Sequence, residues 1–332
     1  MSPQRARLPW RWFGPGLLTA LMIALAATFV SEHYGGPQFL YALFFGIAFN
    51  FLATDPKTRP GIEFAARTVL RFGVALLGVR ITLDQIVSLG AAPVMTVVAA
   101  VMATIAVGAW LARVMKRPLA EGLLTGGAVA ICGASAALAI SSVLPPSERS
   151  GKFTLLTVVG VTLLSTVAMI LYPLVVRLAH FDDAQAGIFL GGTIHDVAQV
   201  VGAGYIISPT AGDNATFVKL LRVAMLLPVV LVFSLIFRGR GVTADGTPLL
   251  PWFLIGFAAL VAASSAGLFS APVIAGLSEI SRWCLVTAIA ALGVKTSFQD
   301  FASLGWRPVV LMVGETAFLA LLILGVLIVR GR

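Results

Sequence analysis

Long apolar stretches alternate with short polar ones along nearly the whole chain. A hydrocarbon core of about 30 Å needs roughly 20 apolar helical residues. The pattern therefore predicts eleven membrane-spanning helices, at residues 15–31, 38–54, 63–79, 92–112, 121–144, 153–177, 186–208, 216–237, 251–268, 274–294 and 307–329. The first apolar run follows a basic start but lacks a convincing small-residue cleavage site, so we interpret it as a retained helix. We expect one polytopic domain over residues 1–332.

Two distant segments of this pattern repeat one another. Residues 67–95 and 282–310 align without a gap at an offset of 215, and eleven of the 29 positions are identical. Corresponding helices are seven apart, and an odd number gives the two copies opposite orientations in the membrane. Inverted repeats of this kind are typical of secondary transporters. We therefore expect copies at about 37–117 and 251–332 around a central region at 120–208; the alternative is convergence of apolar, glycine-rich segments.

The composition agrees with a membrane protein. Apolar residues make up 59% of the chain, charged residues only 11%, and the mean hydropathy is +0.99. The net charge of +9 comes from Lys and Arg clustered in short loops, for example at 57–59 and 113–117. This is the positive-inside pattern with a cytoplasmic N-terminus, and it argues against a nucleic-acid-binding face.

Several functional classes lack their sequence signatures. There is no Walker-type phosphate loop, and the three histidines are too scattered for a strong metal site. The two cysteines, Cys132 and Cys284, lie in apolar surroundings and form neither a disulfide framework nor a zinc motif. We expect no cofactor and no metal.

Segments 121–144 and 186–208 differ from the other predicted helices. Each contains a Gly–Gly pair followed by small or polar residues in mid-span. Glycine weakens helix continuity, and the N-terminus of a half-helix favours an anion. We predict that the pairs mark helix breaks that meet near the membrane centre, the alternative being close helix packing. The candidate substrate-binding residues are Gly126, Gly127, Cys132, Gly133, Ser135, Gly191, Gly192, Thr193, His195 and Gln199.

Three ionisable residues lie far from the predicted membrane interfaces: His195, Asp196 and Glu315. Intramembrane charges are costly and are functional candidates by default. We interpret all three as candidates for ion coupling. For the adjacent pair the alternative is structural, with Asp196 capping a half-helix and His195 making a structural bond. For Glu315 an equally good interpretation is an interhelical ion pair with Lys219 or Arg222.

The two glycine-rich segments also carry a family resemblance. The stretches GGAVAICGASAALA and GGTIHDVAQVVGAG resemble signature stretches of the YeiH-type bacterial inner-membrane proteins, which are known as sulfate exporters. Asp196 is a mild departure, since the family also carries Glu at this position. The resemblance covers nearly the whole chain from the second helix onward. It implies a multi-pass protein of the inner membrane and a sulfur oxyanion as substrate.

Together these observations predict an all-α transporter with inverted repeats and two discontinuous helices, analogous to the bile-acid-symporter and cation–proton-antiporter folds. Its expected partners are a small anion, a proton or sodium ion, and membrane lipid, but no nucleic acid. The alternatives are an anion channel and an intramembrane hydrolase that uses Ser135 or Cys132 with His195–Asp196. Substrate identity, transport direction, the coupling ion, monomer or homodimer, and full crossing or re-entrant hairpins stay open.

Overall fold

The computed structural model describes residues 12–35, 37–84, 91–145, 150–237, 252–296 and 306–330, and every regular element in these ranges is helical. Six helices are long and apolar enough to cross a membrane: Gly14–Tyr34, Pro93–Val114, Phe153–Leu178, Pro209–Ile236, Ala271–Lys295 and Trp306–Val329. Four shorter apolar helices accompany them. The all-helical membrane architecture agrees with the prediction, while the count of eleven spans stays a prediction.

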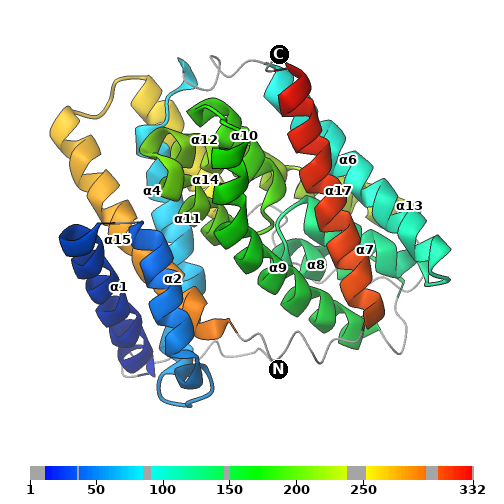
Figure 1. The fold of residues 1–332 in the computed structure, drawn as a ribbon, viewed down its shortest axis with the longest axis horizontal. Coiled ribbons are helices and arrows are strands. Elements are labelled where there is room, and N and C mark those ends of the chain that lie inside the picture. Colours follow the sequence, from blue (N-terminus) through cyan, green and yellow to red (C-terminus); the bar gives the residue numbers. More distant parts are fainter. Residues whose placement is uncertain are drawn as a thin grey trace, which may run out of the picture.

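The helices form two groups, which lie side by side in Figure 1. We call the first the panel group: α1 (Gly14–Tyr34), α2 (Gln38–Ala48), α3 (Arg59–Phe64), α4 (Leu70–Leu77), α14 (Trp252–Ser265) and α15 (Ala271–Lys295). A π-helical turn, η3 (Ala65–Val69), joins α3 to α4, and a 3-10 turn, η4 (Gly78–Arg80), follows α4 directly. Helix α15 packs against both α2 and α4, so segments more than 180 residues apart in the sequence meet in this group.

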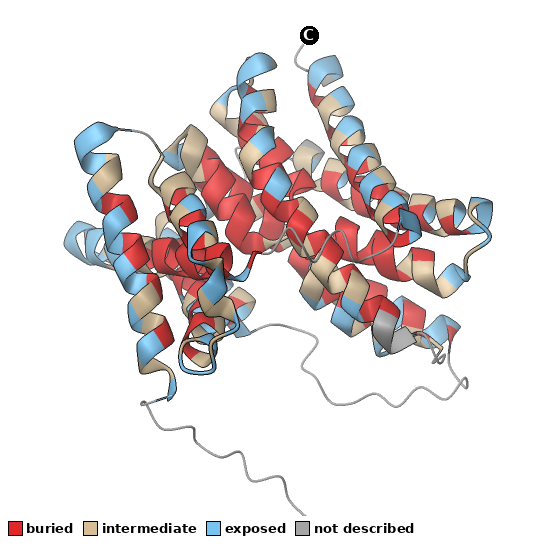
Figure 2. Cartoon of the chain, turned by 60° about the horizontal axis from the view of Figure 1, so that its bottom comes forward, coloured by how far each residue is buried: buried red, intermediate tan, exposed pale blue. Residues whose placement is uncertain are grey.

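We call the second the broken-helix group. It contains α6 (Ala91–Val114), α7 (Leu119–Ala130), α8 (Ala134–Ser141), α9 (Ser150–Leu178), α10 (Asp183–Thr193), α11 (Val197–Ile207), α12 (Pro209–Ala224), α13 (Leu226–Ile236) and α17 (Trp306–Arg330). Its main contacts with the panel group run from α11 to α2 and α15. Figure 2 shows that buried positions concentrate in the middle of the molecule and exposed ones on its periphery.

One pair of helix ends follows the spacing of the sequence repeat. Turn η4 ends at Arg80 and α15 ends at Lys295, which are equivalent positions of the two copies. In Figure 1 the colours along α4 and α15 run in opposite directions, as do those along α6 and α17. The connecting residues 85–90 and 297–305 lie outside the described ranges. The rotation that would relate the two copies stays a prediction.

Glycines bring several helices unusually close together. A Cβ placed on Gly46 of α2 would lie 2.3 Å from the carbonyl oxygen of Ala290 in α15. One on Gly108 of α6 would lie 2.5 Å from the carbonyl oxygen of Gly122 in α7. Small residues at such crossings let membrane helices approach until their backbones touch. The same principle bears on the glycine pairs of the candidate site.

Candidate functional site

Both unusual segments are discontinuous helices. Helix α7 ends at Ala130 and α8 begins at Ala134, and the backbone between them turns at Gly133, whose φ is +63° and ψ is −123°. A side chain is strained at this φ, so glycine is the residue that suits the turn. Helix α10 ends at Thr193 and α11 begins at Val197, with Ile194 and Asp196 in extended conformations. The predicted two discontinuous helices are therefore present.

The glycine pairs themselves do not mark the breaks, which corrects the prediction. Gly126 and Gly127 lie inside α7, and Gly191 and Gly192 lie inside α10 together with Thr193. A Cβ on Gly191 would lie 2.3 Å from the carbonyl oxygen of Ala215 in α12. The pairs serve close packing because a neighbouring backbone or side chain fills the space beside them. Each break follows a few residues later.

The two breaks lie next to each other. A Cβ on Gly133 would be 3.6 Å from the carbonyl oxygen of His195. Helices α7 and α10 therefore bring their C-terminal ends together, and each end leaves carbonyl groups without partners inside its own helix. Such groups are costly to leave unpaired at membrane depth. They also carry the negative end of the helix dipole.

Two fully buried cations on α12, Lys219 and Arg222, satisfy these carbonyls. They are three residues apart and so share one face of the helix. The Lys219 ammonium donates to the carbonyl oxygens of Ile131 (2.6 Å), Ile194 (3.0 Å) and His195. The Arg222 guanidinium donates to those of Val129 (2.7 Å), Ala130 (2.7 Å), Gly191 (3.1 Å) and Ile194 (2.9 Å). One helix thus holds both breaks in place.

The expected ion pair between Glu315 and either cation is not formed, because Lys219 and Arg222 bond the backbone. Glu315, on α17, is fully buried, and its Oε1 atom is hydrogen-bonded to the Thr125 hydroxyl of α7 at 2.7 Å. Its Oε2 atom has no hydrogen-bond partner in the described part of the chain. Glu315 therefore contacts α7 and α6, while the next residue of α17, Thr316, bonds His195.

His195 and Asp196 occupy the second break but have different surroundings. The His195 ring is fully buried and hydrogen-bonds the carbonyl oxygen of Val129 (3.2 Å) and the Thr316 hydroxyl (2.9 Å). Asp196 is half-buried, and its backbone N–H donates to the Ser165 hydroxyl at 2.9 Å. Asp196 is therefore the less enclosed residue of the two, whereas His195 joins three helical segments.

The remaining candidate residues lie around the same junction. Cys132 is buried within the first break, and Ser135 is exposed in the first turn of α8. Gln199 is fully buried in the first turn of α11; its Nε2 atom approaches the Thr166 hydroxyl at 3.4 Å, and its Oε1 atom has no hydrogen-bond partner among the described residues. Among the described residues, no cluster of three or more His, Cys, Asp and Glu could hold a metal ion.

The two half-helices that leave the breaks differ in how they begin. The N-cap residue of α11 is Asp196, whose carboxylate lies at the positive end of the helix. The N-cap residue of α8 is Gly133, which has no side chain to accept hydrogen bonds from the first turn. Within that turn the Ala136 N–H bonds the Cys132 sulfur, and the positive end of the helix favours an anion beside the N–H groups that precede it.

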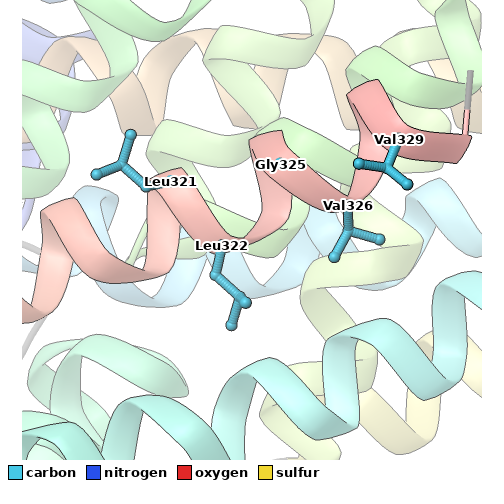
Figure 3. Close-up of a pocket in the computed structure, with 5 residues that line it drawn as sticks. All are labelled: Leu321, Leu322, Gly325, Val326 and Val329. Atoms are coloured by element: carbon cyan, nitrogen blue, oxygen red, sulfur yellow. The ribbon is translucent and has the colours of Figure 1, made fainter.

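Two surface hollows lie along α17. A hollow of about 470 Å³ on α17 is lined by Leu321, Leu322, Gly325, Val326 and Val329 (Figure 3). Its lining contains no polar side chain, which suits lipid better than an anion. A smaller hollow of about 210 Å³ lies between α9 and α17, and Thr316 is part of its wall. Through Thr316, this smaller hollow borders the hydrogen bond to His195.

Sequence reasoning missed the main role of Lys219 and Arg222, and it missed Thr125, Ser165 and Thr316 altogether. The signal for the cations was present: two basic residues three apart in an apolar span. The hydroxyl partners gave no signal, because many apolar helices of this chain contain Ser or Thr, which usually bond their own helix backbone.

Comparisons with known proteins agree on one family. The family described as conserved hypothetical protein 698 matches residues 15–312. The chain is 52% identical to a UPF0324 membrane protein of Chlorobaculum tepidum, over 97% of this chain and 91% of that protein. It is 51% identical to the UPF0324 membrane protein TauZ of Paracoccus pantotrophus, over 93% of each. No solved structure matches. These findings confirm the YeiH-type resemblance.

Proposed function

Since the chain belongs to the conserved hypothetical protein 698 family of UPF0324 membrane proteins, we propose that it is a secondary transporter of a small oxyanion. Sulfate or another sulfur oxyanion is the substrate class that the resemblance implies. We place the protein in the bacterial inner membrane with its N-terminus in the cytoplasm, because its basic residues cluster in loops that this orientation puts inside. Proton or sodium movement would drive the transport.

One observation carries this proposal: two discontinuous helices meet at their breaks inside the broken-helix group. Irregular backbone at membrane depth is tolerated where it is buried in protein or lines a cavity, and discontinuous helices form the substrate and ion sites of many transporters. A purely structural protein would gain nothing from burying two cations to hold such breaks. The arrangement therefore supports a binding site at the junction.

The charges at the junction favour an anion at the start of α8. Lys219 and Arg222 are occupied by carbonyl groups, and Asp196 already supplies a negative charge at the start of α11. The start of α8 has no side-chain cap, so its first N–H groups, other than that of Ala136, and the exposed residue Ser135 are candidate donors. We propose that the oxyanion binds these donors, while Asp196 takes part in ion coupling.

Alternating access would arise from movement between the two helix groups. They meet through α11, where the Tyr205 ring stacks on Phe39 of α2 with a centroid distance of 5.6 Å. Beside this contact Arg80 of η4 forms an ion pair with Asp213 of α12 at 3.3 Å, and the Tyr205 hydroxyl donates to the same carboxylate. This Arg80–Asp213–Tyr205 cluster, the latch, would close one face of the transporter and open when the groups rock apart.

Sulfate uptake into proteoliposomes tests the proposal. We expect uptake that saturates with sulfate concentration, responds to an imposed proton or sodium gradient, and shows exchange with internal sulfate. Non-saturating flux that follows only the sulfate gradient would favour a channel. Labelling of Ser135 or Cys132 by a hydrolase-directed covalent probe would favour the hydrolase, although both ring nitrogens of His195 bond other groups in this structure.

A further inference from the structure

Glu315 is a buried acid without a neutralising partner. It is fully buried, and the described part of the chain contains no salt bridge to it. One carboxyl oxygen has a single hydrogen-bond partner and the other has none. A carboxylate with so little compensation is unfavourable in a low-dielectric interior, whereas a neutral carboxylic acid is tolerated.

The Thr125 hydroxyl can hydrogen-bond Glu315 in both the protonated and the ionised state of the carboxyl group. The Thr125 hydroxyl lies 2.7 Å from Oε1 of Glu315 and 3.1 Å from the carbonyl oxygen of Glu121 on its own helix. With Glu315 protonated, the acid donates to Thr125, and Thr125 donates to the carbonyl of Glu121. With Glu315 ionised, the Thr125 hydroxyl turns and donates to the carboxylate instead. Thr125 can therefore bond the acid before and after a proton leaves.

Several titratable and charged groups around this part of α17 have partners of their own. On α7, Glu121 accepts two hydrogen bonds from Arg117, at 2.6 and 2.8 Å. At the second break, His195 bonds Val129 and Thr316. From α12, Lys219 and Arg222 donate to the carbonyls of the breaks. On α6 the closest group is Gly108, where a Cβ would lie 2.7 Å from Oε1 of Glu315.

The position of Glu315 connects it to both discontinuous helices. It bonds α7 through Thr125, and the next residue, Thr316, bonds His195 in the break between α10 and α11. A shift of α7 or α17 that brought water or a cation to Oε2 would let the proton leave. Conversely, proton binding would favour the packed arrangement seen here.

We infer that Glu315 is a proton-binding residue of this protein, holding its proton in the present conformation and releasing it when α7 and α17 separate. The inference rests on the proposed transport function for its role, and it selects protons as the coupling ion. The site is distinct from the start of α8, where the oxyanion would bind.

Infrared difference spectroscopy of the purified full-length protein tests the protonation directly, without any substrate. We expect the carbonyl band of a protonated carboxylic acid in the wild-type protein at neutral pH, and its loss in Glu315→Gln. Glu121→Gln is the matched control, because Glu121 is already ion-paired, and it should keep the band. Thr125→Val should shift the band, because the hydrogen bond to Oε1 is lost. Identical wild-type and Glu315→Gln spectra would overturn the inference.

Sulfate transport in proteoliposomes tests the coupling role. Glu315→Gln should still exchange sulfate at equal pH on both sides, since glutamine keeps the shape and the Thr125 contact. It should lose the additional accumulation that a pH gradient gives the wild-type protein, while Glu121→Gln keeps it. Accumulation by Glu315→Gln that still follows the gradient would overturn the coupling role. A wild-type protein that shows the infrared band but moves no sulfate would refute the proposed substrate and leave the proton site standing.

Discussion

Lys219 provides the sharpest residue-scale test of how the breaks are stabilised. Lys219→Met would leave the carbonyls of Ile131 and His195 without a donor, while that of Ile194 keeps its bond from Arg222. Each buried polar group left unpaired costs about 1–3 kcal/mol, so we expect a loss of about 2 kcal/mol or more in the free energy of unfolding. Thermal unfolding in detergent micelles measures it. Lys57→Met, at an exposed loop position, is the control; equal midpoints for the two variants would contradict the role.

A substitution at Asp196 can separate the effect of its charge from the effect of its shape. Asp196→Asn keeps a hydrogen-bonding side chain at the start of α11 but removes the charge. Because a carboxylate at a helix N-terminus contributes only about 0.3–1 kcal/mol, the variant should fold with a nearly unchanged unfolding midpoint. We expect sulfate transport to be lost or its pH dependence to change. Wild-type rates between about pH 5.5 and 8.5 would remove Asp196 from the mechanism.

At this scale the sequence allowed prediction of residues that interrupt an apolar pattern. His195 and Asp196 stood out as mid-span polar residues, and the structure places both in a break. The partners of Lys219 and Arg222 could not be predicted, because those partners are backbone atoms. A backbone carbonyl is free to accept a side-chain hydrogen bond mainly where a helix ends, and the residue type does not show where that is.

At the scale of elements, the glycines of the two discontinuous helices form a natural comparison. A Cβ on Gly191 would lie 2.3 Å from a backbone oxygen of α12, whereas one on Gly127 would meet only the flexible end of Ile140. Gly191→Ala must therefore displace a helix, and we expect a cost of about 1–3 kcal/mol or more. Gly127→Ala should cost clearly less. Thermal unfolding of both variants measures the difference, and equal losses would contradict this account.

The same glycines explain why the breaks were predicted in the right segments but at the wrong residues. Glycine lowers helix propensity by about 1 kcal/mol, which packing and backbone hydrogen bonds outweigh in α7 and α10. The helices end instead where Lys219 and Arg222 supply donors for their last carbonyls. The residue at which each helix breaks is thus set by tertiary contacts. Local helix propensity indicates only the segment in which the break occurs.

At the scale of the whole molecule, the proposed transport depends on contact between the two helix groups. The Arg80–Asp213–Tyr205 cluster, the latch, forms part of that contact. Arg80→Glu would place two acids opposite each other, since the partner is Asp213. We expect slower sulfate uptake, because repulsion disfavours closure of this face. The double variant Arg80→Glu/Asp213→Arg should recover part of the rate, and a double-mutant cycle measures the coupling. No recovery, or a fully active single variant, would contradict a gating role.

The inverted repeat makes a prediction about sidedness. Thr82 and Ser297 occupy equivalent positions in the two copies of the repeat. Cysteines introduced at these positions should react with a membrane-impermeant maleimide from opposite sides, with Thr82→Cys labelled from outside intact cells. Labelling of both from the same side would refute the inverted arrangement.

At this scale the repeat and the helical class were visible in the sequence, because they depend on order and periodicity along the chain. The division into two groups was not, since it rests on which helices α11 touches. Those contacts are made by apolar and aromatic side chains such as Phe39 and Tyr205. Many other residues of a membrane protein have the same chemistry.

The bonds from α12 to the breaks have a consequence for evolution. Because Lys219 and Arg222 hold main-chain oxygens, the side chains at positions 131, 132 and 194 can be exchanged without disturbing that support. If the proposed transport function holds for the family, its members could change their substrate while keeping the same backbone support. A library restricted to apolar residues of similar volume at these buried positions, with both cations kept, should yield mostly folded proteins with altered selectivity.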